Sequence, residues 1–138
     1  ENRVAIQLLR DSSNEPNTLG KGKPGLQDNV QQAIKFIETY YSSNITIQDI
    51  CDAIYISPSY LQKVFLKCVG KTPYQYIMEC RHRKAREMLA TTDTSIEKIA
   101  RQCGFVNSAH FSTTFKQKEG VSPLVYKRRL QREQASGR

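Results

Sequence analysis

The sequence has few of the features that mark membrane proteins, disulfide-stapled proteins or metalloproteins. No run approaches the roughly 20 apolar residues that a membrane-spanning helix needs, and no signal peptide is visible. The cysteines have no C-x-x-C spacing and fall inside helical patterns, so we interpret them as reduced, small apolar core residues of a cytosolic protein. They are Cys51, Cys68, Cys80 and Cys103. We expect no metal site, since Cys80 and His82, two residues apart on a helix, point to different sides.

Enzyme motifs and strand patterns are also missing. The sequence contains no Gly-rich phosphate loop, no G-x-G-x-x-G, no H-E-x-x-H and no G-x-S-x-G. Two histidines and scattered acids do not make a catalytic cluster. We therefore expect neither an enzyme nor a cofactor. Alternation of apolar and polar residues never lasts more than a few positions, so the fold class expected is all-α.

Acidic residues are too few to balance the basic ones. The formal net charge is +8, and residues 1–30 contribute nothing to it because their four basic and four acidic side chains cancel. The excess therefore lies in residues 31–138. A basic folded region suggests a polyanionic partner, which releases counterions on binding. Charge alone leaves open a protein whose surface is merely basic.

The sequence contains an internal repeat. Ile47, Ile50 and Ile56 return as Ile96, Ile99 and Phe105, at an offset of 49 residues. A second group returns at an offset of 50: Leu61, Phe65, Gly70, Pro73 and Tyr76 become Phe111, Phe115, Gly120, Pro123 and Tyr126. The one-residue slip falls where a turn is expected. A unit of this size is one short helical hairpin with its trailing turn, and two copies suit a periodic partner such as double-stranded DNA.

Apolar spacing and start signals predict seven helices. The first, over residues 27–42, has apolar residues on one face: Val30, Ala33, Ile34, Ile37 and Tyr41. The others begin at predicted caps, which are Thr46 with Asp49, Ser57 before Pro58, Thr72 before Pro73, Thr94 with Glu97, Asn107, and Ser122 before Pro123. Gly70 and Gly120 end the two helices that follow Ser57 and Asn107.

These signals divide the chain into five segments. Residues 1–26 are expected to be an upstream tail and flexible linker, 27–72 a first helix-turn-helix subdomain, 73–91 a long linker helix, 92–130 a second helix-turn-helix subdomain, and 131–138 a frayed C-terminus. The chain opens with Glu rather than Met, so we expect a fragment whose sensing or dimerising part lies upstream. That part could be a ligand pocket, a phosphorylated receiver or a membrane-tethered sensor. No heptad seam is visible, so we expect a mainly monomeric fragment, with a full-length dimer left open.

Each repeat is a short helix, a tight turn and a longer capped helix. That is the order of a helix-turn-helix whose second helix enters a major groove. Predicted DNA contacts on the first such helix are Ser59, Tyr60, Gln62, Lys63 and Lys67. Those on the second are Asn107, Ser108, Ala109, His110, Ser112, Thr113 and Lys116. Gln can pair with adenine, Lys with guanine, and Ser or Thr with several base edges. A solvated helix face is the alternative for any single residue.

The helix over 73–91 is expected to set the separation of the two hairpins. About 19 residues give a rod of roughly 28 Å, and equivalent grooves of B-DNA lie roughly 34 Å apart. One chain is therefore expected to read two successive major grooves. On this helix we expect His82 to be a partly buried, hydrogen-bonded imidazole. Its four clustered cations cannot all face one way: Arg81, Arg83, Lys84 and Arg86.

These residues resemble the AraC/XylS family of bacterial transcription regulators. In the second repeat the similarity runs through Ile96–Phe105, His110-Phe111, Phe115-Lys116, Gly120–Pro123 and Tyr126–Arg129. In the first it runs through Ser57–Leu61, Phe65, Gly70, Thr72-Pro73 and Tyr76. The resemblance covers about 27–130. It implies a seven-helix DNA-binding domain with two helix-turn-helix subdomains joined by a linker helix. It also implies a bacterial cytoplasmic regulator, an activator acting at promoters, often with RNA polymerase as a partner.

The resemblance also implies which positions face bases. In the first recognition helix they are Ser59, Gln62 and Lys63; in the second they are Ser108, Ala109, His110, Ser112 and Thr113. The chain departs from the family at His82, where an aliphatic residue is usual, and at Ala109 and Thr113, where no Arg or Gln stands. We therefore expect the second helix to contribute less to specificity than the first.

Two other classes of function compete with this interpretation. A nonspecific nucleic-acid binder driven by the +8 charge would show steep salt dependence and little sequence preference. A protein-interaction helical module would show no DNA binding at physiological salt. RNA binding is disfavoured because most Phe and Tyr positions are assigned to the core and leave no exposed aromatic platform.

Overall fold

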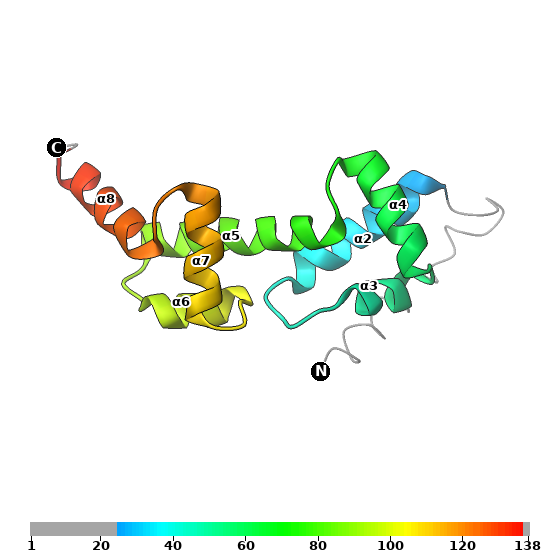
Figure 1. Cartoon of the computed structure of the whole chain (residues 1–138), viewed down its shortest axis with the longest axis horizontal. Helices are drawn as coiled ribbons and strands as arrows, with labels where there is room; N and C mark the ends of the chain where they lie inside the picture. Colours follow the sequence, from blue (N-terminus) through cyan, green and yellow to red (C-terminus); the bar gives the residue numbers. More distant parts are fainter. Residues whose placement is uncertain (1–24, 137–138) are drawn as a thin grey trace. The chain divides into compact units, whose positions relative to one another are not determined.

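A computed structural model describes residues 25–136, and within them the chain forms seven α-helices and no strand. The helices are α2 (Leu26–Tyr40), α3 (Ile47–Ile54), α4 (Pro58–Val69), α5 (Pro73–Thr91), α6 (Ile96–Cys103), α7 (Ser108–Glu119) and α8 (Pro123–Ser136) (Figure 1). The all-α, seven-helix expectation is therefore confirmed. The predicted tail and linker fall almost wholly on residues outside the described range.

The chain divides into two compact units, and the division falls inside α5, between Met78 and Glu79. The first unit contains α2, α3, α4 and the start of α5; the second contains the rest of α5 with α6, α7 and α8. In each unit the two helices of a hairpin, α3 with α4 or α6 with α7, pack against each other (Figure 1). The segment boundaries that we placed at the two ends of α5 stay a prediction.

The second helix of each hairpin has a defined start and a defined end. At the start of α4 the Ser57 hydroxyl accepts a hydrogen bond from the backbone amide three residues later, at 3.2 Å. At the start of α7 the Asn107 side chain does the same at 2.8 Å. Gly70 and Gly120 end these helices with φ of 81° and 85°, a region in which glycine avoids the strain of a Cβ atom. All four predicted signals are confirmed.

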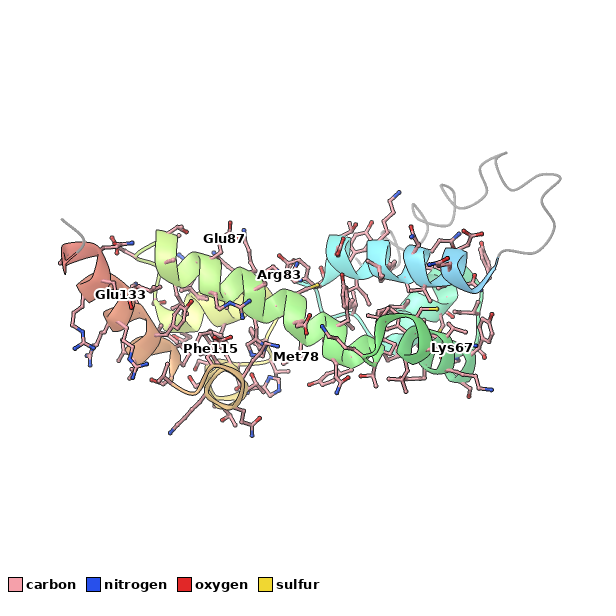
Figure 2. The ribbon with its side chains drawn as sticks, turned by 90° about the horizontal axis from the view of Figure 1, so that it is seen from above. Lys67, Met78, Arg83, Glu87, Phe115 and Glu133 are labelled. Carbon is pink, nitrogen blue, oxygen red and sulfur yellow. The ribbon has the colours of Figure 1, made fainter. Side chains whose placement is uncertain are left out.

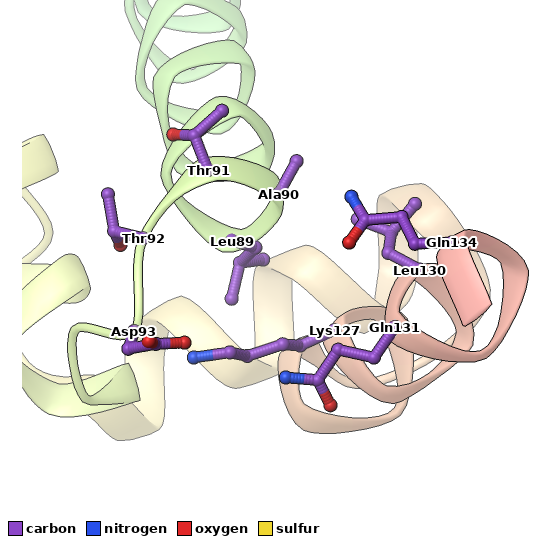
Figure 3. Close-up of a pocket in the computed structure, with 9 residues that line it drawn as sticks. All are labelled: Leu89, Ala90, Thr91, Thr92, Asp93, Lys127, Leu130, Gln131 and Gln134. Atoms are coloured by element: carbon purple, nitrogen blue, oxygen red, sulfur yellow. The ribbon is translucent and has the colours of Figure 1, made fainter.

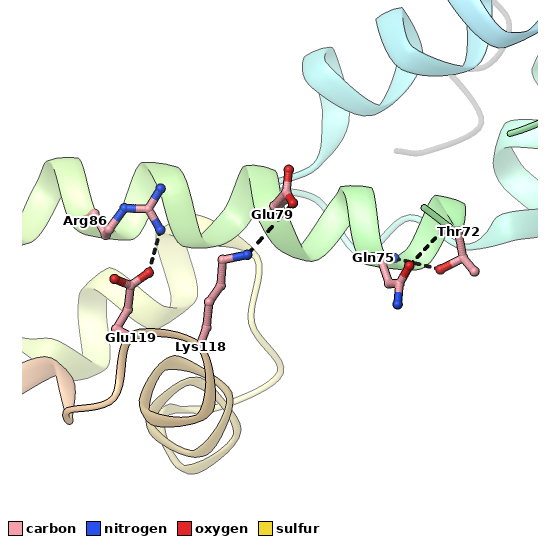
Figure 4. A network of polar contacts seen from close by, with 6 residues as sticks. All are labelled: Thr72, Gln75, Glu79, Arg86, Lys118 and Glu119. Atoms are coloured by element: carbon pink, nitrogen blue, oxygen red, sulfur yellow. Dashed lines mark hydrogen bonds and ion pairs between the residues drawn. The ribbon is translucent and has the colours of Figure 1, made fainter. Parts of the chain in front are cut away.

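Two further starts are reciprocal capping boxes. The Thr46 hydroxyl accepts from the Asp49 amide at 3.0 Å, and the Asp49 carboxylate accepts from the Thr46 amide at 2.9 Å, as predicted. Thr72 and Gln75 make the same pair of bonds at the start of α5, at 3.1 and 2.9 Å (Figure 4). Each box satisfies two amides that a helix start otherwise leaves without partners.

The predicted cap of α6 was wrong by one residue. Ser95, not Thr94, is the cap, and its hydroxyl accepts from the Lys98 amide at 3.2 Å. The Thr94 amide instead donates to the Thr92 hydroxyl at 3.3 Å, which fixes Thr94 in the preceding loop. Both serine and threonine can cap a helix, serine somewhat better, so the adjacent pair offers two starts, and the loop after α5 leads to the later one.

Each unit has its own buried core. In the first, fully or nearly fully buried apolar residues come from four helices: Val30, Ala33, Phe36, Ile37, Ile50, Cys51, Ala53, Ile54, Leu61, Val64, Phe65, Ile77 and Met78. In the second they are Cys80, Ala85, Leu89, Ile99, Ala100, Cys103, Phe105, Phe111 and Phe115. Cys68 was expected among the first set and is exposed. The last turn of α4 is not covered by the core, since Leu66 and Lys67 are exposed there too.

One aromatic contact occurs in both units. The rings of Phe65 and Tyr76 meet edge to face at 5.6 Å, and those of Phe115 and Tyr126, which lie 50 residues further on, meet at 5.3 Å. Both phenylalanines are fully buried. Edge-to-face pairs of this kind contribute about 0.5–1.5 kcal/mol beyond the burial of their area. The second unit adds a Phe105–Phe111 contact at 4.7 Å.

The last helix is longer than predicted. We expected residues 131–138 to fray, but α8 continues to Ser136. The residues after Arg129 are good helix formers, and no glycine or proline occurs before Gly137. The basic run at Lys127 therefore lies inside the helix rather than closing the ordered part.

The cap assignment at α6 can be tested by alanine substitution. Ser95→Ala should lower the free energy of unfolding by about 1 kcal/mol, because it removes the acceptor for an amide at the helix start. Thr94→Ala should change it by less than about 0.5 kcal/mol. Urea denaturation followed by circular dichroism measures both. A larger loss in the free energy of unfolding from Thr94→Ala than from Ser95→Ala would show that Thr94 is the cap.

Candidate nucleic-acid interface

The exposed face of α4 carries all five residues predicted for the first recognition helix. Its other face is buried through Leu61, Val64 and Phe65, which fixes the rotation of the helix about its axis. The five exposed residues are Ser59, Tyr60, Gln62, Lys63 and Lys67. The structure thus confirms that they point outward, which any contact with a partner requires.

This face is basic as well as exposed. Lys63 and Lys67 lie four residues apart, so their side chains leave α4 on the same side (Lys67 is labelled in Figure 2). Neither makes an ion pair with any residue of the described range, and α4 contains no acidic residue. The positive charge of the face is therefore not neutralised within the unit and is available to an anion.

The second recognition helix is less fully exposed. Four of its predicted contacts are exposed, namely Asn107, Ala109, Thr113 and Lys116, whereas Ser108, His110 and Ser112 are only half-exposed. The His110 ring lies 6.0 Å from that of Phe105, and its Nδ1 atom is buried with no hydrogen-bond partner in the described part of the chain. His110 is therefore only partly outward, because Phe105 in the turn before α7 packs beneath it.

Two ion pairs attach α7 to α5 within the second unit (Figure 4). The Arg86 guanidinium donates to the Glu119 carboxylate at 2.7 Å, with both side chains largely shielded from solvent. Lys118 lies 3.9 Å from Glu79, which is about two turns before Arg86 on α5. The sequence did not predict either pair, because each joins residues more than 30 positions apart and no local spacing indicates such a contact. They hold the far end of α7 and leave its N-terminal half as the accessible part.

His82 provides a third link between the same helices. It is 3% exposed, and its Nε2 lies 3.2 Å from the Thr114 hydroxyl on α7. Its ring also packs 5.1 Å from that of Phe105 and 6.1 Å from that of Phe115 on α7. The expected hydrogen-bonded imidazole is confirmed, although it is more deeply buried than predicted. The Thr114 hydroxyl gives the Nε2 atom of this buried polar residue a hydrogen-bonding partner, at a position where the family usually has an aliphatic residue.

The four cations of α5 have different environments, as expected. Arg81 is buried, Lys84 lies 3.1 Å from Glu87, and Arg86 is paired with Glu119. Arg83 is exposed, with no ion pair inside residues 25–136 (Figure 2). Arg86 thus joins α5 to α7, whereas Lys84 pairs with a residue of α5 itself.

Two buried cysteines have perturbed acidity. Burial raises the pKa of Cys103 to about 11, with Glu87 adding to the rise and Lys84 opposing it. Burial also raises the pKa of Cys51, with a further contribution from Asp52. Removal from water disfavours the charged thiolate, so both thiols stay protonated at neutral pH. Both behave as core residues, as predicted; the same prediction was wrong for Cys68, which is exposed.

A surface hollow of about 230 Å³ lies between the end of α5 and α8 (Figure 3). Leu89 forms part of its floor, and the charged ends of Asp93 and Lys127 face each other across it (Figure 3). Between Gly25 and Ser136 no group of three or more His, Cys, Asp or Glu side chains is placed to hold a metal ion. No helix there is long and apolar enough to cross a membrane.

Comparisons with known proteins agree with this geometry. A family model described as a helix-turn-helix domain matches residues 50–129, which is more than half of the chain. The regulatory protein PocR of Salmonella typhimurium is 29% identical over 125 residues, covering 89% of this chain. The chain spans only 41% of the length of PocR.

Two solved structures have the same fold. The C-terminal domain of AraT, a response regulator from Geobacillus stearothermophilus, is 30% identical with a TM-score of 0.72, covering 76% of this chain and 88% of that one. The DNA-binding domain of AdpA, solved in complex with a target DNA, has a TM-score of 0.69 and covers 72% of this chain and 89% of that one. At 21% identity, the likeness to AdpA shows the fold alone.

The thiol environments predict a pH-dependent labelling pattern. Exposed Cys68 should react with a thiol reagent at pH 8, whereas Cys103 should stay unlabelled up to about pH 10, because its folded-state pKa is about 11. This pKa lies above the 9.0 of the unfolded thiol, so the protonated thiol's contribution to stability is complete below pH 9 and is lost as pH rises through 11. Mass spectrometry of peptides after brief labelling would check this. Equal labelling of both thiols at pH 8 would contradict the burial.

Proposed function

The chain belongs to the AraC/XylS family of helix-turn-helix regulators, and from that membership we propose that it binds double-stranded DNA sequence-specifically through α4 and α7. The observation that carries the proposal is a structural one. Each hairpin presents a capped second helix whose buried face is fixed by a phenylalanine and whose opposite face is polar or basic. A helix presented in this way can enter a major groove, which is wide enough to admit it.

The chemistry of α4 suits base recognition. The Gln62 amide can donate and accept at once, which matches the N6 and N7 edge of adenine. Lys63, one residue on, suits the O6 and N7 acceptors of guanine. Lys67 lies one turn further along the helix and suits a phosphate of the groove wall, where a cation positions the protein without reading sequence.

The chemistry of α7 suits a weaker readout. Ala109 and Thr113 are exposed and four residues apart, so their methyl groups share one side of the helix and suit contacts with thymine methyls. Ser108 and Ser112 offer short hydroxyls to base edges, and Lys116 suits a phosphate. His110 contributes through the exposed part of its ring.

The linker helix supports simultaneous binding by both hairpins. α5 has 19 residues, which at the α-helical rise give roughly 28 Å. Successive major grooves on one face of B-DNA are separated by roughly 34 Å. We propose that one chain places α4 and α7 in successive major grooves, with the remaining distance supplied by the packing of each hairpin on α5.

The wider role of the protein extends this proposal. AraC-type membership and a domain that spans less than half of PocR suggest a bacterial regulator with further parts that sense a signal or dimerise. We propose that it works in the bacterial cytoplasm as an activator at promoters, with RNA polymerase as a partner. We also propose that the isolated chain is monomeric and that a dimeric full-length protein would pair two such domains.

Selection of binding sites from a random duplex library tests the proposal. The recovered site should contain two conserved blocks centred about one helical turn apart, roughly 10 base pairs. Affinity for that duplex and for a scrambled control should then be compared at roughly 150 mM salt. Equal affinity for the two would leave only nonspecific binding by a basic surface, and binding of neither would leave a protein-interaction module.

Substitution of Gln62 should weaken binding to the selected duplex alone. Gln62→Ala should cost about 1–3 kcal/mol on that duplex and little on the scrambled one, because it removes a base contact. Lys67→Ala should weaken both duplexes alike and lower the salt slope by about 0.9, because it removes a phosphate contact. Gln31→Ala, on an exposed position of α2, is the control and should change neither affinity. Fluorescence anisotropy titrations at several salt concentrations measure all three, and equal losses on both duplexes from Gln62→Ala would refute base reading.

The two blocks of the selected site should differ in importance. Base changes in the block bound by α4 should cost more affinity than changes in the block bound by α7, because α7 has short side chains where an Arg or Gln would make bidentate contacts. Scanning each base pair in turn would measure the difference. Equal losses in both blocks would contradict it.

A further inference from the structure

The last helix has the highest net positive charge of the seven helices in the described range. α8 contains four cations and one acid, so its formal charge is +3, out of +8 for the whole chain. The cations are Lys127, Arg128, Arg129 and Arg132, and the acid is Glu133 (labelled in Figure 2). The three arginines are exposed. The proposed roles of α4 and α7 make no use of this charge.

Two of the arginines share one side of the helix. Arg128 and Arg132 are four residues apart, so their side chains leave α8 in the same direction. Together with Gln131 and Ala135 they line a further surface hollow. Within residues 25–136 no ion pair involves any cation of α8. We call Arg128 and Arg132 the arginine pair, and its charge is available to an outside anion.

The arginine pair is unfavourable for the helix itself. Two like charges at this spacing repel each other and destabilise a helix. Glu133 does not compensate for them, because it directly follows Arg132 and so leaves α8 in a different direction. The repulsion between the two guanidinium groups would fall if an anionic partner lay against this side of α8.

The internal repeat shows that the fold does not require cations at these positions. α5 is the counterpart of α8 in the first repeat, and 50 residues before the arginine pair it has Met78 and His82, both buried. The cations that α5 does contain include Arg86, which is paired with a carboxylate of α7. The arginine pair has neither kind of role, since it is neither buried nor paired within the described residues.

The chemistry of this face favours DNA over a protein partner. From Arg128 to Ala135 no exposed residue is large and apolar, whereas the centre of a protein interface is usually built from apolar and aromatic side chains. A guanidinium group, in contrast, matches the oxygens of a phosphate with two parallel N–H groups. A pair of arginines without apolar neighbours therefore suits a nucleic-acid backbone.

The place of α8 in the second unit also favours DNA. α8 follows α7 after only three residues, Gly120–Ser122, and the two helices are in contact. The start of α8 lies beside α7 in both views (Figure 1, Figure 2). In the proposed function α7 lies in a major groove, and phosphates line both edges of that groove. The arginine pair begins in the second turn of α8, close to that groove.

We propose that the arginine pair of α8 binds backbone phosphates bordering the groove that α7 occupies. This rests on the proposed function, because it needs α7 in that groove. The contact strengthens binding of the second hairpin, whose recognition helix has short side chains. Because phosphates are the same in every sequence, the contact raises affinity for every duplex and selects none.

Charge-removing variants test the contact. Arg128→Gln, Arg132→Gln and the double glutamine variant remove one or two charges and keep a good helix former at each position. The double lysine variant at the same positions keeps both charges. Lys35→Gln is the matched control, because it removes one charge from an exposed position of α2, outside both hairpins.

Titrations of the selected and scrambled duplexes at several salt concentrations give Kd and its salt slope for each variant. Each single glutamine variant should lower the slope by about 0.9 and raise Kd about fivefold at roughly 150 mM salt, on both duplexes. The double glutamine variant should lower it by about 1.8. The double lysine variant should keep most of the slope, and Lys35→Gln should leave it unchanged. The thermal midpoint of the glutamine variants should stay the same or rise, because a repulsion is removed.

Ethylation of single phosphates locates the contact on the DNA. In the wild-type complex, ethylation of phosphates that border the block bound by α7 should interfere with binding. In the double glutamine variant some of these phosphates should no longer matter, because their partners are gone. Phosphates around the block bound by α4 should keep their effect in both proteins.

Other results would overturn the proposal. A folded double glutamine variant with the Kd and salt slope of Lys35→Gln would show that α8 does not touch DNA and would leave an acidic protein as its partner. A loss confined to the selected duplex would mean that the arginines read bases. A wild-type chain that prefers neither duplex would refute sequence-specific binding, and the wild-type titration shows this before any variant is compared.

Discussion

The structure depends on one packing contact that occurs twice. In each unit a fully buried phenylalanine of the hairpin's second helix meets, edge to face, a tyrosine of the helix that follows: Phe65 with Tyr76, and Phe115 with Tyr126. This contact fixes which face of α4 or α7 is covered, and so which face is left for a partner. The caps at Ser57 and Asn107 then fix where each helix begins. Small units with modest cores need such local constraints, because burial alone stabilises them little.

The same frame carries two different surfaces. α4 keeps long polar and basic side chains, including Gln62 and Lys63, on a face without acids. α7 carries short side chains and is tied to α5 by two ion pairs and by the contact of His82 with Thr114. The second helix of the first hairpin thus directs its long polar side chains to the exposed surface. The second hairpin uses more of its polar groups to hold α7 in place, which suits a positioning role.

Much of the fold could be predicted because its signals are local. Ser57 before Pro58, Asn107, and the glycines that end α4 and α7 act within a few residues, so the pattern locates those helices. Prediction failed where two adjacent residues could both cap a helix, as with Thr94 and Ser95, or where tertiary contacts decided. Which helix covers which decides the exposure of Cys68, the partial burial of His110 and the pairing of Arg86 with Glu119. The spacing of residues along a helix does not contain that information. The outward set on α4 was predicted in full because burial of Phe65 leaves only one rotation of the helix.

The central claim is that the exposed faces of α4 and α7 are where this chain meets DNA. Backbone amide chemical shifts of the ¹⁵N-labelled chain, followed as the selected duplex is added, test this directly. The account predicts that the largest changes fall on the exposed positions of α4 and α7 and on their preceding turns, with those of α4 larger, while the exposed face of α2 changes little. Binding that leaves α4 and α7 unchanged and shifts α2 instead would contradict it.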